Sequence, residues 1–416
     1  MRTNWAGSHT YRAVGFARPR TLLEAQELVA ANERVRALGS GHSFTDLADT
    51  DGVLVALDAL PGDVSVDIAR ATATVSSGLL LGDVGEALHR RGWALPTLPS
   101  LPHITVAGAI ATGTHGSGDR TGSLASLVCG LDVIGPDGEL RSVQAEEPDF
   151  DGWVVSLGLL GIVTRVTLKV VPTYNVRQFV YTGLPWPDFL NDFDDVMASG
   201  YSVSVFTTWT GDAVNQVWIK TVGASEPASL RSAVPAHVPM HMIPGQSSDA
   251  ATAQLGIEGP WHDRLPHFRR EFTPSSGEEL QTEYLVPRRR AADALAHVRR
   301  LAPRFAPLLQ IGEIRTVAGD RLWLSGSYGE DVVALHFTWR RAWQEVHDTL
   351  PLLEEALLPL GARPHWGKCF VATRDELEAQ YPRFADFTEL RRRADPAGKF
   401  ANAFTHRVLG YSARRR

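Results

Sequence analysis

A stretch of small residues, SLPHITVAGAIATGTHGSG at residues 100–118, constrains the fold of this chain more than any other. Its glycines, alanines and threonines leave backbone N–H groups accessible, and consecutive accessible N–H groups form a site for phosphate. A second loop, GSGHS at residues 39–43, lies in the same part of the chain. Turns explain a single glycine-rich loop more often than ligands do, but two loops together favour a bulky dinucleotide held by backbone contacts. Neither loop has the lysine of a P-loop, and the Rossmann Gly-x-Gly-x-x-Gly motif is missing.

The order of the expected elements predicts an α+β fold rather than a doubly wound sheet. Thr21 and Glu24 form a candidate capping box at the start of an amphipathic helix, and a second helix is expected to stop at Gly92. Short strands and hairpins surround these helices. From about residue 176 longer strands follow, with helices such as the one expected over residues 288–303. We therefore expect a second, mainly antiparallel domain with flanking helices, and then a helical tail.

Composition excludes several classes of protein. The 416 residues have a net charge of −6, which gives no electrostatic reason to bind nucleic acid or an anionic membrane. The two cysteines, Cys129 and Cys369, lie far apart without metal-ligand spacing, so neither a metal site nor a disulfide framework is indicated. The N-terminus has no signal-peptide core, and no apolar run reaches the ~18 residues of a membrane span. We expect a cytoplasmic, monomeric protein that does not bind membranes.

Two predicted strands each have one polar face. Glu313 and Arg315 are two residues apart in LLQIGEIRTV, and His336 and Thr338 are two apart in VVALHFTW, so each pair shares a strand face. Lys368 lies between aromatic residues in PHWGKCF, which is unusual for a surface lysine. Each pattern alone is more typical of a solvent-exposed strand. Together the five side chains suit a substrate with several hydroxyl groups.

Several motifs are similar to those of a known family. The motifs GSGHS, ATGTHGS and SLGLLGIVT resemble the FAD-binding (PCMH-type) domain of vanillyl-alcohol-oxidase type flavoproteins, and EIRT, HFTW, RPHWGK and DPAGKFANAF resemble the sugar and alditol oxidases among them. The likeness runs from Asn4 to about Leu409. It implies a two-subdomain FAD-binding domain over residues 1–175 and a substrate domain over residues 176–375. A C-terminal segment, residues 376–416, would pack back near the flavin.

The resemblance also implies how FAD is held. His42 stands where these oxidases join a histidine ring to the 8α carbon of the flavin, and the region around residue 100 has no cysteine for a second bond. A covalent nitrogen there would raise the reduction potential of the flavin and favour hydride transfer from an unactivated alcohol. The other expected FAD contacts are Leu38, Gly39, Ser40, Gly41, Ser43, Ser100, Thr105, Gly108, Thr112, Gly113, Thr114, His115 and Val163.

The implied reaction is oxidation of the terminal primary hydroxyl of an alditol, such as xylitol or sorbitol, to the aldose, with O2 reduced to H2O2. By resemblance, the alditol would contact Ser100, Glu313, Arg315, Thr338 and Lys368. Arg315 and Lys368 would stabilise the developing alkoxide, and Glu313 would accept a hydrogen bond from a neighbouring hydroxyl. Either His336 or a neutral Lys368 would take the hydroxyl proton. Pro99 lies where the family governs the access of oxygen.

Two alternatives remain from the sequence. An aldonolactone oxidase or dehydrogenase would share the FAD-binding domain and a similar set of polar residues. A flavin-binding or sugar-binding protein without turnover would be a different class, but it would have no need of His42 opposite a complete polar set.

Overall fold

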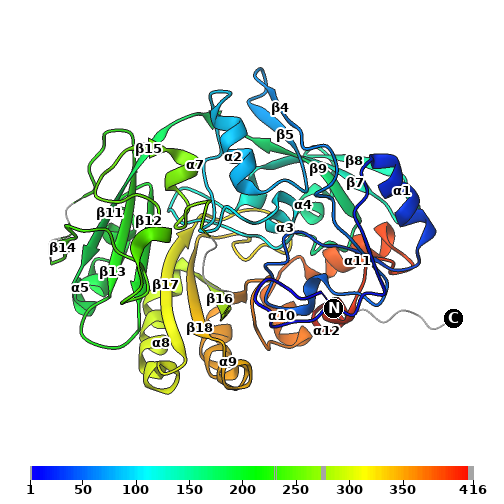
Figure 1. Cartoon of the computed structure of the whole chain (residues 1–416). Coiled ribbons are helices and arrows are strands. Elements are labelled where there is room, and N and C mark those ends of the chain that lie inside the picture. The colour runs from blue at the N-terminus through cyan, green and yellow to red at the C-terminus, as the bar shows by residue number, and fades with distance from the viewer. Residues whose placement is uncertain (1, 229, 231, 273–277, 411–416) are drawn as a thin grey trace.

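Two sheet-based halves meet along a central region in the computed structural model (Figure 1), which describes residues 2–228, 230, 232–272 and 278–410. Helices and antiparallel sheets are combined as expected for an α+β fold. Within the described residues, no helix is both long and apolar enough to cross a bilayer. In the same residues, no group of three or more His, Cys, Asp or Glu side chains is placed to hold a metal ion.

The N-terminal half contains two main sheets. One is parallel and has the order β1-β3-β2, and the other is antiparallel and has the order β4-β5-β9-β7-β8. The strands are β1 (Gly15–Ala17), β2 (Val35–Ala37), β3 (Val53–Val55), β4 (Val64–Asp67), β5 (Thr72–Ser76), β7 (Val128–Ile134), β8 (Leu140–Gln144) and β9 (Ile162–Lys169), with a separate pair β6 (Trp93–Ala94) and β10 (Val171–Pro172). The helices are α1 (Leu22–Ala31), α2 (Leu81–His89), α3 (Val106–Ala111) and α4 (Phe150–Val154), with short 3-10 turns η1 (Asp46–Ala48) and η2 (Leu124–Leu127).

The expected helix starts and stops are confirmed with small differences. Thr21 Oγ1 accepts a hydrogen bond from Glu24 N at 3.1 Å, so the N-cap of α1 is as predicted. In a capping box the Glu24 carboxylate would accept a hydrogen bond from Thr21 N. Here it accepts from Arg20 N instead, at 2.7 Å, which is one residue before the N-cap. Helix α2 has Arg90 as its C-cap, and Gly92 follows two residues later with φ of +80°.

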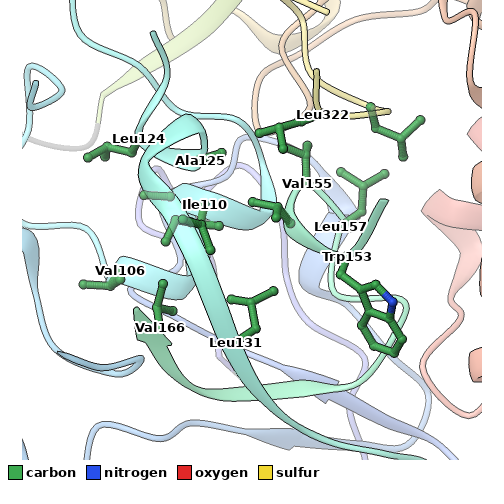
Figure 2. Close-up of a cluster of buried hydrophobic side chains, with 14 of the residues drawn as sticks. Val106, Ile110, Leu124, Ala125, Leu131, Trp153, Val155, Leu157, Val166 and Leu322 are labelled. Atoms are coloured by element: carbon green, nitrogen blue, oxygen red, sulfur yellow. The ribbon is translucent and has the colours of Figure 1, made fainter. Parts of the chain in front are cut away.

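An apolar core holds the second glycine-rich segment in place. Val106 and Ile110 of α3 pack with Leu131 of β7, Val166 of β9 and Trp153 of α4 (Figure 2). These side chains are all buried. Helix α3 is short, so its position depends on this packing more than on its own hydrogen bonds.

The second half is built on a nine-stranded sheet in which every neighbouring pair is antiparallel. The order is β14-β11-β13-β12-β17-β18-β16-β19, and β15 also pairs with β11. The strands are β11 (Asn175–Thr182), β12 (Ser202–Thr207), β13 (Gln216–Val222), β14 (Val234–Pro235), β15 (Gly259–Pro260), β16 (Glu279–Pro287), β17 (Leu309–Val317), β18 (Val332–Arg340) and β19 (Arg363–Pro364). Its helical elements are α5 (Trp186–Asn191), α6 (Phe193–Met197), α7 (Trp261–Arg264), α8 (Ala291–Phe305), α9 (Trp343–Leu357), η3 (Ser248–Ala250), η4 (Arg288–Arg290) and η5 (Leu358–Leu360).

The two faces of this sheet differ in chemistry. Helices α8 and α9 lie side by side (Figure 1) and cover one face, where Leu335, Phe337 and Trp339 of β18 pack into a continuous core. The alternate residues His336 and Thr338 therefore face the opposite way, as the alternation in the sequence predicts. This opposite face borders the cavity described below.

The C-terminal helices return to the N-terminal half. Helices α10 (Arg374–Gln380), α11 (Phe384–Ala394) and α12 (Ala403–Leu409) bury Phe387 and Phe404 in the same core as α3. Asn402 Nδ2 donates to the backbone oxygens of Asp46, Leu47 and Asp49 at 3.1, 2.9 and 2.7 Å. The end of the chain thus fixes the segment that follows the GSGHS loop.

Candidate active site

A single cavity of about 1200 Å³ extends from the glycine-rich loops to the polar face of the nine-stranded sheet. Ordinary ligand pockets measure roughly 300–1,000 Å³, so this one has room for a large cofactor and a small substrate together. It is lined by nearly all of the residues that the sequence singled out: Leu38, Gly39, Ser40, Gly41, His42, Ser43, Pro99, Ser100, Thr105, Gly108, Thr112, Thr114, His115, Val163, Glu313, Arg315, His336, Thr338 and Lys368. Gly113 is different, since it forms the turn after α3 with φ of +68° and does not line the cavity.

The two glycine-rich loops contact each other at the cavity wall. Thr105 N donates to Ser40 Oγ at 3.3 Å. A Cβ added at Gly39 would lie 2.2 Å from Thr105 Oγ1, so only glycine permits this approach. Gly41 has φ of +72°, a conformation that glycine adopts without strain. Thr105 Oγ1 is buried and has no hydrogen-bond partner among the described residues, as expected where a polar ligand supplies one. These features fit a dinucleotide cofactor.

His42 is held by the N-terminal segment. Its ring stacks on Trp5 with centroids 4.8 Å apart and an interplanar angle of 27°, and Trp5 N donates to Gly41 O at 2.8 Å. Burial, reinforced by the charge of nearby His103, lowers the pKa of His42 to about 4. The imidazole is therefore neutral at neutral pH and keeps a nucleophilic nitrogen.

A row of three ionisable residues crosses the sheet opposite the loops. His336 on β18 is paired in register with Glu283 on β16 and with Glu313 on β17, so the three lie side by side. All three are buried, with exposures of 7%, 1% and 5%. Strand pairing brings these residues together even though they are far apart in the sequence.

Glu283 is the centre of the charged network. Its Oε1 lies 2.5 Å from Arg315 NH2 and 3.1 Å from His115 Nε2, and its Oε2 accepts a short hydrogen bond from Lys368 Nζ. Burial is the largest influence on the pKa of Glu283 and raises it. The cations Arg315 and Lys368 together with His115 outweigh burial, and the pKa falls well below its usual range. The buried carboxylate thus stays ionised between two cations.

Arg315 reaches Glu283 across the strand between them. Its neighbour on β18 is Ala334, whose short side chain leaves the path open for the guanidinium. Arg315 Nε lies 3.6 Å from Glu313 Oε2. Glu283 is therefore the carboxylate that contacts both Arg315 and Lys368 most closely.

The hydrogen bonds of His336 define its protonation. Lys368 Nζ donates to His336 Nδ1 at 2.8 Å, and His336 Nε2 lies 3.0 Å from Thr338 Oγ1. An ammonium only donates, so Nδ1 presents a lone pair and the ring proton sits on Nε2. Burial, with a further contribution from Lys368, lowers the pKa of His336 to about 4. Both ring nitrogens of the neutral imidazole therefore already have a hydrogen-bond partner.

Three residues in or directly behind the site were missed from the sequence. Glu283 follows the same two-residue alternation as the other polar strands, with Gln281 on its face, and this signal was present in GEELQTEYLVP. His267 Nε2 lies 2.8 Å from Glu313 Oε1, and its backbone N donates to Ser100 O at 3.1 Å. Lys220 lies behind His267, at 3.2 Å from Nζ to Nδ1. No sequence pattern marked His267 or Lys220.

Two family descriptions match separate parts of the chain. Residues 14–144 match the family described as FAD binding domain, and residues 277–408 match D-arabinono-1,4-lactone oxidase. The structure is similar to that of cholesterol oxidase from B. sterolicum, with a TM-score of 0.78 at 15% identity over 98% of this chain and 96% of that one. The fold and the loops thus define an FAD-dependent oxidoreductase.

Relatives that match nearly the whole chain show which family of FAD-dependent oxidoreductases it belongs to. The chain is 47% identical over 410 residues to alditol oxidase from a Streptomyces strain, covering 98% of both chains. It is 30% identical to L-gulono-1,4-lactone dehydrogenase from Mycobacterium tuberculosis, over 98% of this chain and 99% of that one. L-gulonolactone oxidase from Bos taurus is 26% identical over 98% of this chain and 97% of that one. The chain belongs to the alditol oxidase family of vanillyl-alcohol-oxidase type flavoproteins.

Proposed function

We propose that this protein oxidises the terminal primary hydroxyl of alditols such as xylitol and sorbitol to the aldose. The observation that carries the proposal is the polar face of β16, β17 and β18, which meets the two glycine-rich loops in one cavity. FAD held by the two glycine-rich loops would supply the acceptor for a hydride from the carbinol carbon and pass the electrons to O2, which would give H2O2.

The substrate hydroxyls are bound by the side chains that line the polar end of the cavity. Arg315 is a permanent cation, and a fixed positive charge near the reacting hydroxyl stabilises negative charge that develops on oxygen. Glu313 is ionised: burial raises its pKa, but Arg315 and His267 outweigh burial and depress it. Glu313 therefore accepts a hydrogen bond from a hydroxyl next to the reacting one. Ser100 and Thr338 provide further hydroxyl partners.

Lys368 is the better of the two candidate proton acceptors. Lys368 acts as the acceptor after its resting ammonium has lost one proton to the cavity. The two remaining N–H bonds stay on Glu283 Oε2 and His336 Nδ1, and the lone pair is free. The lone pair then takes the proton of the substrate hydroxyl, and Lys368 becomes the cation beside the developing alkoxide. Burial lowers the pKa of Lys368, which favours the neutral form, and Arg315 acts in the same direction while Glu283 opposes it. His336 has no free lone pair in this arrangement.

We further propose that His42 forms a single covalent bond to the flavin 8α carbon. The C–N bond would replace one C–H bond of the methyl group and the imidazole would lose its N–H proton, while the two electrons and two protons released would reduce the isoalloxazine, which O2 would reoxidise. A neutral imidazole held in one orientation by Trp5 is a competent nucleophile for an electron-poor methyl group. Acid-precipitated protein should stay yellow, and a peptide that contains His42 should carry the mass of FAD. His42→Ala should release its flavin into the acid supernatant, and a colourless pellet from the unaltered protein would contradict the link.

A lactone oxidoreductase is the second candidate, because a lactone oxidase family matches residues 277–408. A panel of alditols, aldonolactones and simple alcohols with H2O2 detection separates the two. Each unpaired polar group left in a buried site costs roughly 1–3 kcal/mol, so shortening the polyol should sharply lower kcat/KM. We expect xylitol or sorbitol to be best, glycerol much weaker and ethanol nearly inactive. A lactone that outperforms every alditol would contradict the proposal.

Three expectations from the sequence stay predictions: the cytoplasmic location, the monomeric state and the influence of Pro99 on the reaction with oxygen. The domain limits at residues 175 and 375 also stay predictions.

A further inference from the structure

Lys220 is a buried lysine that does not line the cavity. It lies on β13 with 1% exposure, on the same strand face as Trp218. Its Nζ donates to Leu265 O, to Pro266 O at 3.2 Å and to His267 Nδ1 at 3.2 Å. These three acceptors take all three N–H bonds of the ammonium form. Burial lowers the pKa of Lys220 to about 7 and Arg315 acts in the same direction, whereas the charge of Glu313 favours the ammonium.

His267 connects this lysine to the site. Its ring is fixed edge-on between Phe206 and Trp218, with centroids 5.5 and 5.4 Å away. Its Nδ1 faces Lys220 and its Nε2 faces Glu313 Oε1 at 2.8 Å. The ammonium form of Lys220 has no lone pair, so Nδ1 presents its own lone pair to it, and the ring proton sits on Nε2 and donates to Glu313.

We propose that Lys220 is a positioning residue for substrate binding, which fixes His267 as a neutral Nε2–H donor to Glu313. This inference rests on the proposed function, because it takes Glu313 as a substrate ligand. Glu313 Oε1 is then occupied by His267, and Oε2 remains for a hydroxyl of the substrate. Burial lowers the pKa of His267 to about 4, and the charge of Lys220 acts in the same direction, while Glu313 raises it.

Without Lys220 the aromatic neighbours still hold the ring, but Nδ1 no longer faces a donor and the positive charge that opposes protonation of the ring is gone. A cationic or reversed His267 would pair differently with Glu313 and change how that carboxylate accepts a hydroxyl. The step affected is binding, so KM should change more than kcat. Arg315 also faces this cluster, and its NH2 donates to Glu283 rather than to His267.

The test compares Lys220→Met with Lys169→Met, which replaces an exposed lysine on β9. We expect Lys220→Met to raise KM for xylitol about tenfold, with flavin content unchanged and kcat within a factor of about three, because the loss corresponds to roughly one hydrogen bond to a charged group. Lys169→Met should match the parent. In a His267→Phe background the effect of Lys220→Met should disappear, because coupled residues are not additive. An unchanged KM, or the same rise in both backgrounds, overturns the inference.

A measurement on the unaltered protein covers the case in which Lys220→Met does not fold. In 15N-histidine-labelled protein, the His267 signals, assigned by their loss in His267→Phe, should report a neutral Nε2–H ring at neutral pH. A cationic ring or an Nδ1–H ring overturns the inference. This measurement needs no turnover, so it judges Lys220 separately from the alditol reaction, which fails only if the unaltered protein oxidises no alditol.

Discussion

Glu283 compensates the two cations of the site and has no contact with solvent. Its side chain is fully buried between Arg315 and Lys368. Removing one partner of a buried ion pair typically costs ~3–5 kcal/mol, because the remaining charge is left uncompensated. Glu283→Gln should therefore lower the free energy of unfolding by ~3–5 kcal/mol at neutral pH in chemical denaturation. The matched surface change Glu355→Gln should leave the unfolding curve unaltered, and equal curves for both variants would contradict this role.

The same carboxylate predicts how stability depends on pH. Arg315 and Lys368, with His115, depress the folded-state pKa of Glu283 despite its burial, below the ordinary value of 4.5 that the unfolded chain has. A depressed carboxylate contributes stability above the unfolded pKa, and the contribution is lost as pH falls towards the folded pKa. The difference in unfolding free energy between the parent and Glu283→Gln should thus be constant above about pH 5 and shrink below it. A difference that grows in acid would show that Glu283 is protonated in the folded protein.

At the scale of elements, the cofactor site depends on the contact between the first glycine loop and the start of α3. Gly39→Ala places a Cβ 2.2 Å from Thr105 Oγ1 and must push the loops apart. We expect purified Gly39→Ala to retain much less FAD per chain, measured by absorbance, while the fold persists. Adding Thr105→Ala removes the obstructing hydroxyl and should restore part of the flavin. Full flavin content in Gly39→Ala would show that the contact is unimportant.

The strands show which parts of the site could be predicted from the sequence alone. Alternation was enough to place Glu313, Arg315, His336 and Thr338 on cavity-facing positions, because side chains alternate strictly along a strand. The register between neighbouring strands could not be predicted from the sequence, and it is this register that places Glu283 beside His336. The missed Lys220 has a similar cause, since its neighbour His267 comes from a loop that is 47 residues away in the chain. The role of a buried lysine follows from its acceptors, which only the fold reveals.

The glycine loops illustrate the opposite case. Their small residues predicted a dinucleotide site from local chemistry, and a cavity lined by both loops is present. The conformation of a glycine-rich loop depends mainly on its own residues, so these loops could be predicted from the sequence. The close approach of Gly39 to Thr105 could not be predicted, because the two residues are 66 positions apart in the chain.

At the scale of the whole molecule, the two halves and the C-terminal helices enclose one reaction space. The sheet supplies the polar groups, and the N-terminal half supplies the glycine loops and His115, whose Nε2 lies 3.1 Å from Glu283 Oε1. Helix α12 and Asn402 fix the segment after the GSGHS loop. Neither half alone contains a complete site.

The most direct test of the account is anaerobic mixing of the purified yellow protein with xylitol, followed by the loss of flavin colour. The parent should bleach, and Lys368→Met should bleach at least ~10²-fold more slowly while it stays folded and yellow, because one charge-stabilising group is lost at the reacting oxygen. Readmitting O2 should restore the colour and yield H2O2. A parent protein that keeps its colour with xylitol and sorbitol, or a Lys368→Met variant that bleaches at the parental rate, would contradict the account.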